Sequence, residues 1–587
     1  MCSIFGYYKL EQDATPHPDF LNNAFNLMRH RGPDFEHCVP VKRACLGHQR
    51  LSIIDTSESG RQPMLEGSYL ITFNGEIYNY VELQRSLLPY EAFRSTSDTE
   101  VLLKLLERFG PAVLNKLNGM FAFGFYDLAK ERLILVRDRF GVKPLYYMIE
   151  RGILYFASEI KPLASIKKIV ARNWNIYQKY ITELATDFND ETHVEGIYQV
   201  RKGHYLSIDD GTVSSRKWYH GHDSSIDLSI FNRKMETLQY FESLLTDAIR
   251  IRMRSDVPVS LTLSGGLDSS VIYILLKEKL NQDIKCYSFS HPGRTTDESN
   301  IVKRLVGSYG DSCKFISTSS EHRIEDWNKV VSHLEFPSWS FSALAYSDIY
   351  RFISEDGCRV VIEGHGSDEQ LGGYSYMVEQ AAATYALERE YLRCFQTYYI
   401  VKRMRGEKLY EMLKSSKQFI SFLRSARRGD FAGFHKTLQG AFDFKILPIV
   451  LRTFDRMSMM HSVESRSPFM DYRIVEFLTA LPLHMKVSSI GSKAILRELL
   501  KKHGFDFIYK QHKKQGFSSD EPIFLNNLDT QEALKQQINS LPDLQFSLIK
   551  REAEEYLSKN THNWDSAFPL AKASSLAITD KLYGFSL

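Results

Sequence analysis

The sequence predicts a multi-domain protein of the α/β class, with a strand-rich N-terminal half and a C-terminal half built on a parallel sheet. At 587 residues the chain is too long for one hydrophobic core, so about two to four domains are expected. Strand-like runs dominate residues 120–160. Beyond residue 235, short apolar strands alternate with helical segments, a pattern typical of parallel strands joined by crossover helices.

The composition is that of an ordinary globular protein, with 43% hydrophobic and 25% charged residues. The net charge of +3 gives no electrostatic reason to expect binding to nucleic acid or to a membrane surface. No apolar run approaches the ~18 residues of a membrane span, and the N-terminus does not resemble a signal peptide. The seven cysteines include no CxxC pair, which favours a reducing, cytoplasmic location over a disulfide scaffold or a structural zinc site.

A glycine-rich segment, SGGLDSS at residues 264–270, lies between an apolar run and a periodic apolar run. This order predicts a strand, a glycine turn and a helix N-terminus, where unpaired amides and the helix dipole favour an anion. Ser264, Ser269 and Ser270 add hydroxyl donors, and Asp268 offers a carboxylate to a metal carried by phosphate. An ordinary turn with a Ser/Asp N-cap is the alternative, but the motif in this context favours a nucleotide site.

Cys2 is the first candidate nucleophile. If Met1 is removed, the thiol and a free α-amine belong to the same residue. An α-amine has a pKa of about 7.7–8.0 and can act as a general base, while a thiol needs little activation. The alternative is an inert, buried cysteine on the first strand.

Four polar clusters follow Cys2. RHRGPD (29–34) ends a helical segment from about residue 19, and HQRLSI (48–53) lies in a strand-like run. TFNGEIYN (72–79) is expected to interrupt a strand at its Asn-Gly pair, and SDTE (97–100) to cap a helix over 101–109. A simple hairpin turn at Asn-Gly and a purely structural Asp98 are the alternatives.

In this order and spacing, Cys2 and the four clusters, with GMFAF (119–123) and RDRFGVKPLY (137–146), resemble the glutaminase domain of the N-terminal-nucleophile amidotransferases. The resemblance implies an αββα sandwich, two antiparallel sheets flanked by helices, over residues 2–205.

The same resemblance implies the roles of the site residues. Cys2 would attack the glutamine side-chain amide, and Asn74 and Gly75 would form the oxyanion hole. The glutamine site would consist of Asn74, of Arg50 at the α-carboxylate, and of Glu76 and Asp98 at the α-ammonium group.

In the C-terminal half, a helix is expected at residues 235–253 and strands at 285–290, 313–316 and 358–362. The last strand leads into EGHGSDEQLGGY (363–374), so both glycine-rich loops follow the carboxyl ends of strands, where open α/β sheets bind ligands. SGGLDSS has no lysine after its glycines and resembles the pyrophosphate loop of ATP pyrophosphatases.

Together with a Cys2 glutaminase and the GSDEQLGGY loop, this segment resembles the glutamine-hydrolysing asparagine synthetase family. Further matching segments lie at residues 447–452, 455–459, 463–471, 493–498 and 513–517. The resemblance implies a helix-rich ATP-pyrophosphatase domain over 235–587, joined to the glutaminase near 205–235.

The implied chemistry is activation of a substrate carboxylate by ATP and Mg²⁺, followed by attack of ammonia on the acyl-adenylate. Asp268 and Asp368 would hold the metal, and Lys493 would neutralise phosphate instead of lying solvated on a helix. Ammonia would travel through an internal tunnel whose lining the sequence does not identify. The implied ATP-binding residues are Leu263, Ser264, Gly265, Gly266, Asp268, Ser269, Ser270, Ser288, Gly364, Asp368 and Lys493.

The GHGSDE segment departs from the family pattern, which typically reads SGEGSDE. His365 stands where the family has a glutamate that acts as a base toward ammonia. Histidine also accepts a proton near neutral pH, so His365 is a candidate catalytic base, and a role only in loop shape is the alternative. The helical segment 381–444, rich in Arg, Lys and Tyr, carries no motif. Its charges are expected to form a solvated face, and a part in shaping the acceptor pocket is the alternative.

The sequence therefore predicts a glutamine- and ATP-dependent amide ligase that converts aspartate to asparagine. The same chemistry on another carboxylate, such as a sugar uronic acid or a natural-product intermediate, is the first alternative. A non-catalytic binding or regulatory protein is the second, and it is disfavoured by an intact Cys2, Asn74, Asp98 and Lys493. The oligomeric state stays open, with a homodimer as one alternative.

Overall fold

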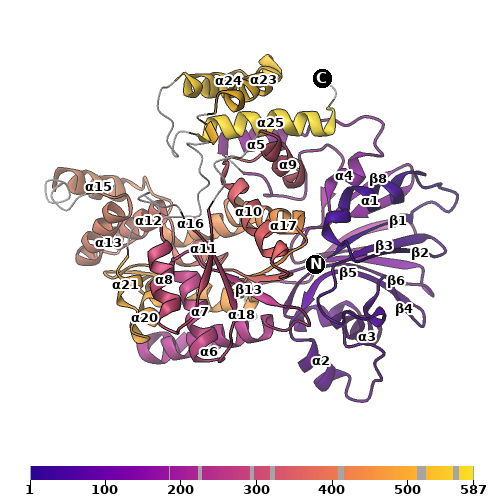
Figure 1. Ribbon diagram of the computed structural model, residues 1–587, viewed down its shortest axis with the longest axis horizontal. Helices are drawn as coiled ribbons and strands as arrows, with labels where there is room; N and C mark the ends of the chain where they lie inside the picture. The colour runs from indigo at the N-terminus through magenta and orange to yellow at the C-terminus, as the bar shows by residue number, and fades with distance from the viewer. Residues whose placement is uncertain are drawn as a thin grey trace.

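The structure, a computed structural model, describes residues 2–183, 185–221, 228–290, 297–317, 324–407, 416–511, 524–525, 527–558 and 567–585. The N-terminal half, with its antiparallel strands, lies beside a C-terminal half in which helices surround a parallel sheet (Figure 1). The predicted α/β multi-domain fold class is confirmed. Within the described residues, every helix is too short or too polar to cross a membrane.

Two six-stranded antiparallel sheets stack in the N-terminal half. In spatial order, the first contains β10 (Tyr198–Gln199), β8 (Tyr146–Glu150), β9 (Ile153–Ala157), β1 (Ser3–Lys9), β3 (Ala44–Arg50) and β2 (Phe35–Pro40). The second contains β12 (Thr212–Lys217), β11 (His204–Asp209), β7 (Arg132–Arg137), β6 (Gly119–Asp127), β5 (Tyr69–Ile77) and β4 (Met64–Glu66). Side chains from both sheets, including Ile4, Leu46, Ala122 and Phe156, form the buried layer between them.

Helices cover the outer faces of the two sheets. Helix α1 (Phe20–Met28) and α4 (Ile160–Ala164) pack on the first sheet, and α3 (Asp98–Phe109), with α2 (Tyr80–Leu87) against it, packs on the second. The apolar positions of α3 recur at helical spacing, so Val101, Leu102, Leu105 and Leu106 are buried together.

The parallel sheet has the order β15 (Cys313–Ile316), β14 (Lys285–Phe289), β13 (Val259–Thr262), β16 (Val360–Ile362) and β17 (Glu464–Arg466). Successive strand residues face opposite cores, as Cys286 and Tyr287 do. One core includes α6 (Lys234–Arg252), α7 (Leu267–Glu278), α8 (Ser299–Gly307), α18 (Tyr472–Ala480) and α20 (Ala494–Lys502). The other includes α5 (Trp174–Glu183), α9 (Ile324–Leu334), α10 (Ser342–Glu355), α17 (Leu447–Met460), α23 (Leu528–Asn539), α24 (Asp543–Leu557) and α25 (Phe568–Tyr583).

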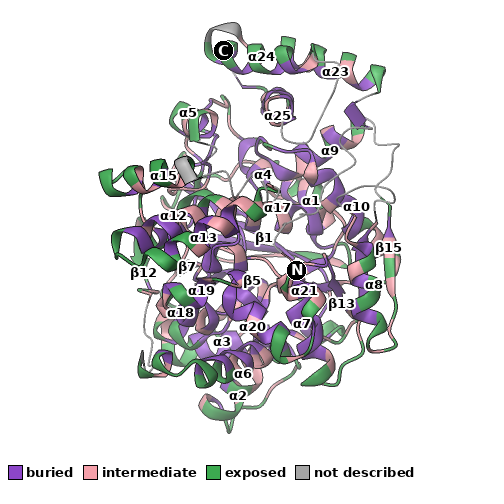
Figure 2. Ribbon diagram, turned by 90° about the vertical axis from the view of Figure 1, so that its left-hand side faces the viewer, coloured by how far each residue is buried: buried purple, intermediate pink, exposed green. Residues whose placement is uncertain are grey.

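A third group of helices begins within the 363–374 segment. It comprises α11 (Ser367–Leu371), α12 (Ser375–Leu387), α13 (Tyr391–Met404), α15 (Ser416–Arg428), α16 (Phe434–Gly440) and α19 (Leu483–Lys486). Buried side chains of α12, α13, α15 and α16 pack together. Exposed residues mark the outer surface of α15, in line with the solvated face expected for this segment (Figure 2).

Two local expectations were wrong. The Asn-Gly pair does not interrupt a strand, because β5 continues through Asn74 and Gly75, which pair with Ala122 and Phe121 of β6. The edge strand β17 was not anticipated, because three residues are too few for a recognisable pattern.

Candidate active sites

Cys2 directly precedes β1 and is 8% exposed. Its backbone N–H donates to Asn74 Oδ1 at 3.0 Å, and its thiol lies 3.9 Å from the carbonyl oxygen of Leu51. Burial raises the pKa of the Cys2 thiol above its ordinary value. A thiol in this environment needs a general base before it can attack.

Asn74 and Gly75 lie beside Cys2 within β5. The cluster of Cys2, Asn74, Gly75, Arg50, Glu76 and Asp98 is called the Cys2 pocket below. The side-chain nitrogen of Asn74 is buried and has no hydrogen-bond partner. Gly75 has a φ of +149°, and a Cβ at this position would lie 2.0 Å from the carbonyl oxygen of Met120. Only glycine fits there. An unpaired buried donor beside a nucleophile is the feature that a developing oxyanion requires.

Three charged side chains predicted for glutamine binding are also buried here. Arg50 donates to the carbonyl oxygen of Ser57 at 2.7 Å and lies close enough to Cys2 to interact with it electrostatically. Asp98 accepts from the backbone N–H of Ile77 at 2.8 Å. Burial raises the pKa of Asp98 to about 6, and burial together with the charge of Glu464 raises that of Glu76.

Buried ion pairs join the Cys2 pocket to the C-terminal half. Arg466 of β17 lies 3.2 Å from Glu76. Arg31 donates to the Cys2 carbonyl oxygen at 3.3 Å and, through both terminal nitrogens, to Asp455 of α17 at 3.0 and 3.2 Å. Loss of either partner would leave an uncompensated buried charge, so these pairs fix the two halves against each other at the pocket.

A second cavity, of about 240 Å³, lies at the carboxyl ends of β13 and β16. These strands are parallel neighbours, so the two glycine-rich loops meet. A Cβ on Gly364 would lie 2.8 Å from the Cβ of Asp268. Of the predicted ATP-binding residues, the cavity is lined by Ser264, Gly265, Gly266, Asp268, Ser269, Gly364, Asp368 and Lys493.

Three predicted ATP-binding residues lie behind that lining. The backbone N–H of Leu263 donates to Tyr287 at 2.8 Å within the sheet, and Ser288 is buried in β14. Ser270 is buried in the first turn of α7, where its hydroxyl has no hydrogen-bond partner.

Lys493 lies between the two carboxylates predicted to hold a metal. Its ammonium group is 2.8 Å from Asp368 and also contacts Asp268. Burial alone would lower the pKa of Lys493, but the two carboxylates raise it above its ordinary value. Lys493 has a φ of +53°, a conformation that non-glycine residues adopt mainly at functional positions.

The carboxylates suit a cation that arrives with phosphate. The Oδ1 atom of Asp268 is buried and has no hydrogen-bond partner. Among the described residues, no group of three or more His, Cys, Asp or Glu side chains could hold a metal by itself. Mg²⁺ commonly takes one or two protein carboxylates and completes its shell with phosphate oxygens and water, so Asp268 and Asp368 fit this ion.

His365 lines the same cavity and is held by a buried carboxylate. Its Nε2 lies 3.0 Å from Glu363, which is 2% exposed. Glu363 also accepts from Tyr350 at 2.6 Å and from Thr262 at 3.1 Å. Burial alone would raise the pKa of Glu363, but His365 and the hydrogen bonds from Ser465 and Tyr350 hold it below its ordinary value. The imidazole packs against Phe454, with 3.5 Å between ring centroids.

A small cavity of about 30 Å³ lies between the two halves. The N-terminal half contributes Tyr78, Met120 and Val142 to its lining, and the C-terminal half contributes His365 and Phe454. The last two residues also line the cavity of about 240 Å³ at the ends of β13 and β16, which is called the ATP cavity below because of the residues predicted there. A space of this volume accommodates a molecule the size of water or ammonia.

Sequence reasoning missed several of these residues. Arg31, Asp455, Glu464 and Arg466 lie in segments that matched the family, but no role followed from their positions. Nothing in the sequence pointed to Glu363 except its place in the loop that departs from the family pattern. The matching segment 513–517 lies outside the described residues.

Comparisons with known proteins agree with this geometry. The chain matches the models of a glutamine amidotransferase domain over residues 1–219 and of asparagine synthase over residues 240–576. It is 27% identical over 568 residues to the amidase chyE of Penicillium rubens, with 84% of each chain covered. It is 28% identical over 531 residues to glutamine-hydrolysing asparagine synthetase 3 of Bacillus subtilis, covering 85% of this chain and 84% of that one.

A third relative, the glutamine-hydrolysing asparagine synthetase B of Escherichia coli, is 29% identical over 394 residues, covering 64% of this chain and 65% of that one. The asparagine synthase model alone spans more than half of the chain. The chain belongs to the asparagine synthase family and is an ATP-dependent, glutamine-hydrolysing amide ligase.

Proposed function

We propose that this chain converts aspartate to asparagine with ammonia taken from glutamine, releasing AMP and pyrophosphate. One observation carries the proposal: the Cys2 pocket and a cavity suited to phosphate and Mg²⁺ occur in one chain, with a small cavity between them. Similarity to proteins named asparagine synthetases supports aspartate as the acceptor. In this proposal residues 2–205 form the glutaminase domain and residues 235–587 the synthetase domain.

In the glutaminase reaction, the Cys2 α-amine, free after removal of Met1, takes the thiol proton. The sulfur attacks the side-chain amide carbon of glutamine, while the Asn74 side chain and the Gly75 N–H stabilise the charge on the oxygen. Arg50 pairs with the α-carboxylate, and Glu76 and Asp98 with the α-ammonium group. The α-ammonium group of Cys2 returns the proton to the amide nitrogen, the C–N bond breaks and ammonia leaves. Water later releases glutamate from the thioester.

In the synthetase reaction, a carboxylate oxygen of the acceptor attacks the α-phosphorus of ATP. The bond between the α- and β-phosphates breaks, and pyrophosphate leaves. Lys493 and the amides of residues 264–270 offset the phosphate charge. Asp268 and Asp368 would hold Mg²⁺, which supplies further charge neutralisation when it is bound.

Ammonia must stay unprotonated between the two reactions. It passes through the small cavity beside Met120 and Val142, which opens toward His365. Ammonia then attacks the acyl carbon, AMP leaves, and His365 takes the surplus proton. Glu363 orients the imidazole ring for this step, because it accepts a hydrogen bond from it at 3.0 Å.

A second candidate function keeps this chemistry and changes the acceptor. His365 replaces the glutamate usual in asparagine synthetases, and the chain is also similar to a protein named an amidase. These observations favour a carboxylate other than aspartate, such as a sugar uronic acid or a natural-product intermediate.

The test is incubation of the full chain with ATP, Mg²⁺, glutamine and aspartate. We expect asparagine, AMP and pyrophosphate in equal amounts. If neither asparagine nor aspartate-dependent pyrophosphate forms, aspartate is not the acceptor, and a screen of other carboxylates for pyrophosphate release then identifies it.

A further inference from the structure

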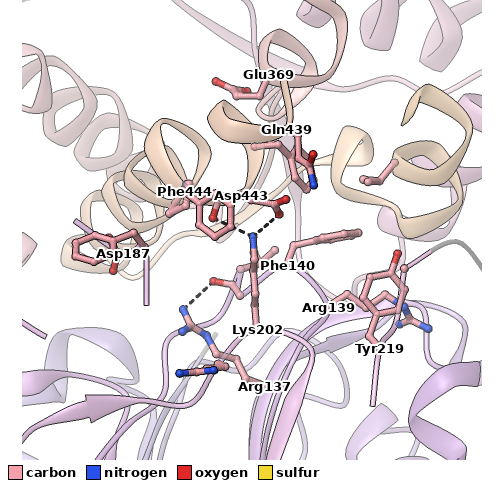
Figure 3. Close-up of a pocket in the computed structure, with 18 of the residues that line it drawn as sticks. Arg137, Arg139, Phe140, Asp187, Lys202, Tyr219, Glu369, Gln439, Asp443 and Phe444 are labelled. Atoms are coloured by element: carbon pink, nitrogen blue, oxygen red, sulfur yellow. Dashed lines mark hydrogen bonds and ion pairs between the residues drawn. The ribbon is translucent and has the colours of Figure 1, made fainter. Parts of the chain in front are cut away.

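A cavity of about 770 Å³ lies between the two halves of the chain, outside the Cys2 pocket and the ATP cavity (Figure 3). Phe140, Lys202 and Tyr219 line it from the N-terminal half, and Gln439 and Phe442 from the C-terminal half. Its volume falls in the range of about 300–1,000 Å³ that is typical of small-molecule sites. No step of the proposed reaction uses it.

Two buried cations on its wall, Arg139 and Lys486, lack a carboxylate partner among the described residues. Arg139 instead donates to the carbonyl oxygens of Asn115 and Leu117. Lys486, the last residue of α19, lines the cavity and is 2% exposed. Its ammonium group donates only to the carbonyl oxygen of Thr479, at 3.5 Å, and no carboxylate in the described ranges pairs with it. Burial lowers the pKa of Lys486 to about 7. A negative group in the cavity would offset the cost of keeping this ammonium ion charged.

The acidic side chains on the wall already have partners. Asp187 lies 3.1 Å from Arg452, Lys202 donates to Asp443 at 2.8 Å, and Asp455 accepts from Arg31. Two glutamates accept from tyrosine hydroxyls, Glu369 from Tyr374 at 2.9 Å and Glu476 from Tyr219 at 3.3 Å. Lys486 therefore stands out as the group that needs an anion.

The remaining wall suits a planar, apolar group. Phe140 stands edge-on to Phe442 and to Tyr219, with ring centroids 5.7 and 5.8 Å apart. Figure 3 shows Phe140 near the centre of the cavity, beside the Lys202–Asp443 pair. Aromatic edges and faces of this kind favour further aromatic or flat apolar surfaces.

We propose that this cavity binds a small organic acid with a planar, apolar body, whose carboxylate meets Lys486 and whose body lies against Phe140 and Phe442. The site goes beyond the proposed function, which needs only the Cys2 pocket and the ATP cavity. Two sources have this chemistry: an acceptor that carries a second carboxylate for adenylation, or an effector that binds without being amidated. Glu369 lines both this cavity and the ATP cavity, so a ligand here lies next to the adenylation site.

The test uses 2-naphthoate as the probe and isothermal titration of the full chain with ATP and Mg²⁺ present, so that the ATP cavity is filled. Lys486→Gln removes the cation, and Gln439→Trp fills the cavity from an exposed position on α16. Lys436→Gln, an exposed change on the same helix away from the cavity, is the matched control. We expect each of the first two changes to weaken binding at least ~tenfold and the control to leave it unchanged.

Unchanged affinity in Gln439→Trp, or no saturable binding to the wild type, would overturn the proposal. Gln439→Trp keeps the test decisive even if Lys486→Gln does not fold. Pyrophosphate release that depends on naphthalene-2,6-dicarboxylate, which keeps one carboxylate free for adenylation, identifies an acceptor site, and binding without release identifies an effector site. Because binding needs no turnover, it is measured independently of whether aspartate is amidated.

Discussion

The Cys2 pocket and the 363–374 loop differ in what holds their polar groups. In the pocket, Asn74 and Gly75 belong to a strand whose register with β6 is fixed residue by residue. In the loop, His365 lies between β16 and α11, and its ring is held by one hydrogen bond to Glu363 and by packing on Phe454. The first site is built on sheet hydrogen bonds, and the second on side chains.

This difference shows where the chain can change its chemistry. At Gly75 a single added Cβ would meet a backbone oxygen, so substitution would disrupt the sheet as well as the site. At residue 365 a different side chain needs only a new hydrogen-bond partner, which Glu363 provides. The backbone around Gly75 therefore restricts that position to glycine, whereas only side chains restrict residue 365.

The largest expected effect comes from the nucleophile. Cys2→Ala should reduce glutamine hydrolysis and glutamine-driven amide synthesis at least ~10³-fold, because no other group replaces the attacking sulfur. Synthesis driven by added ammonium should continue at the wild-type rate. Glutaminase assays and amide quantification measure both. Cys38→Ala, at a half-buried cysteine of β2, is the control, and loss of ammonium-driven synthesis in Cys2→Ala would contradict two separate sites.

A smaller effect is expected at the loop. His365→Gln should lower ammonium-driven amide formation on the order of 10²-fold, because the proton acceptor is lost, while pyrophosphate release continues. Glu363→Gln should cost less, on the order of tenfold, since the base remains but its orientation is weakened. The readout is the ratio of amide to pyrophosphate. An equal fall of both products in either variant would show that the loop serves adenylation and would remove His365 as the base.

The sequence was informative where several site residues fall within one short segment. The clusters around Asn74 and Asp98 bring side chains close to Cys2, and most of SGGLDSS lines the cavity at the ends of β13 and β16. The sequence could not reveal the buried ion pair between Arg31 and Asp455, because these residues are 424 positions apart. Nor could it show that pairing of β5 with β6 overrides the turn preference of Asn-Gly. Lys486 carries no motif, and its significance comes only from its burial on the wall of a cavity that both halves line.

The smallest expected effect concerns Asp98, which accepts a hydrogen bond from Ile77 of β5 in the Cys2 pocket. Its pKa of about 6 lies above the ordinary 3.8 because of burial, and it must be ionised to hold the α-ammonium group of glutamine. The kcat/KM for glutamine should therefore show an additional fall below pH 6, reaching roughly tenfold at pH 5, and Asp98→Asn should lack this step. Steady-state assays between pH 5 and 8 measure it, with pyrophosphate release as the control.

Unfolding cannot produce the same step through Asp98. Because the folded-state pKa is the higher one, the folded state binds more protons between about pH 4 and 6, so protonation of Asp98 stabilises the fold as the pH falls. A step near pH 6 in kcat/KM with an unchanged melting temperature would thus report on glutamine binding. If Asp98→Asn kept the step, the titrating group would be a different one, with Glu76, whose pKa burial also raises, as the first candidate.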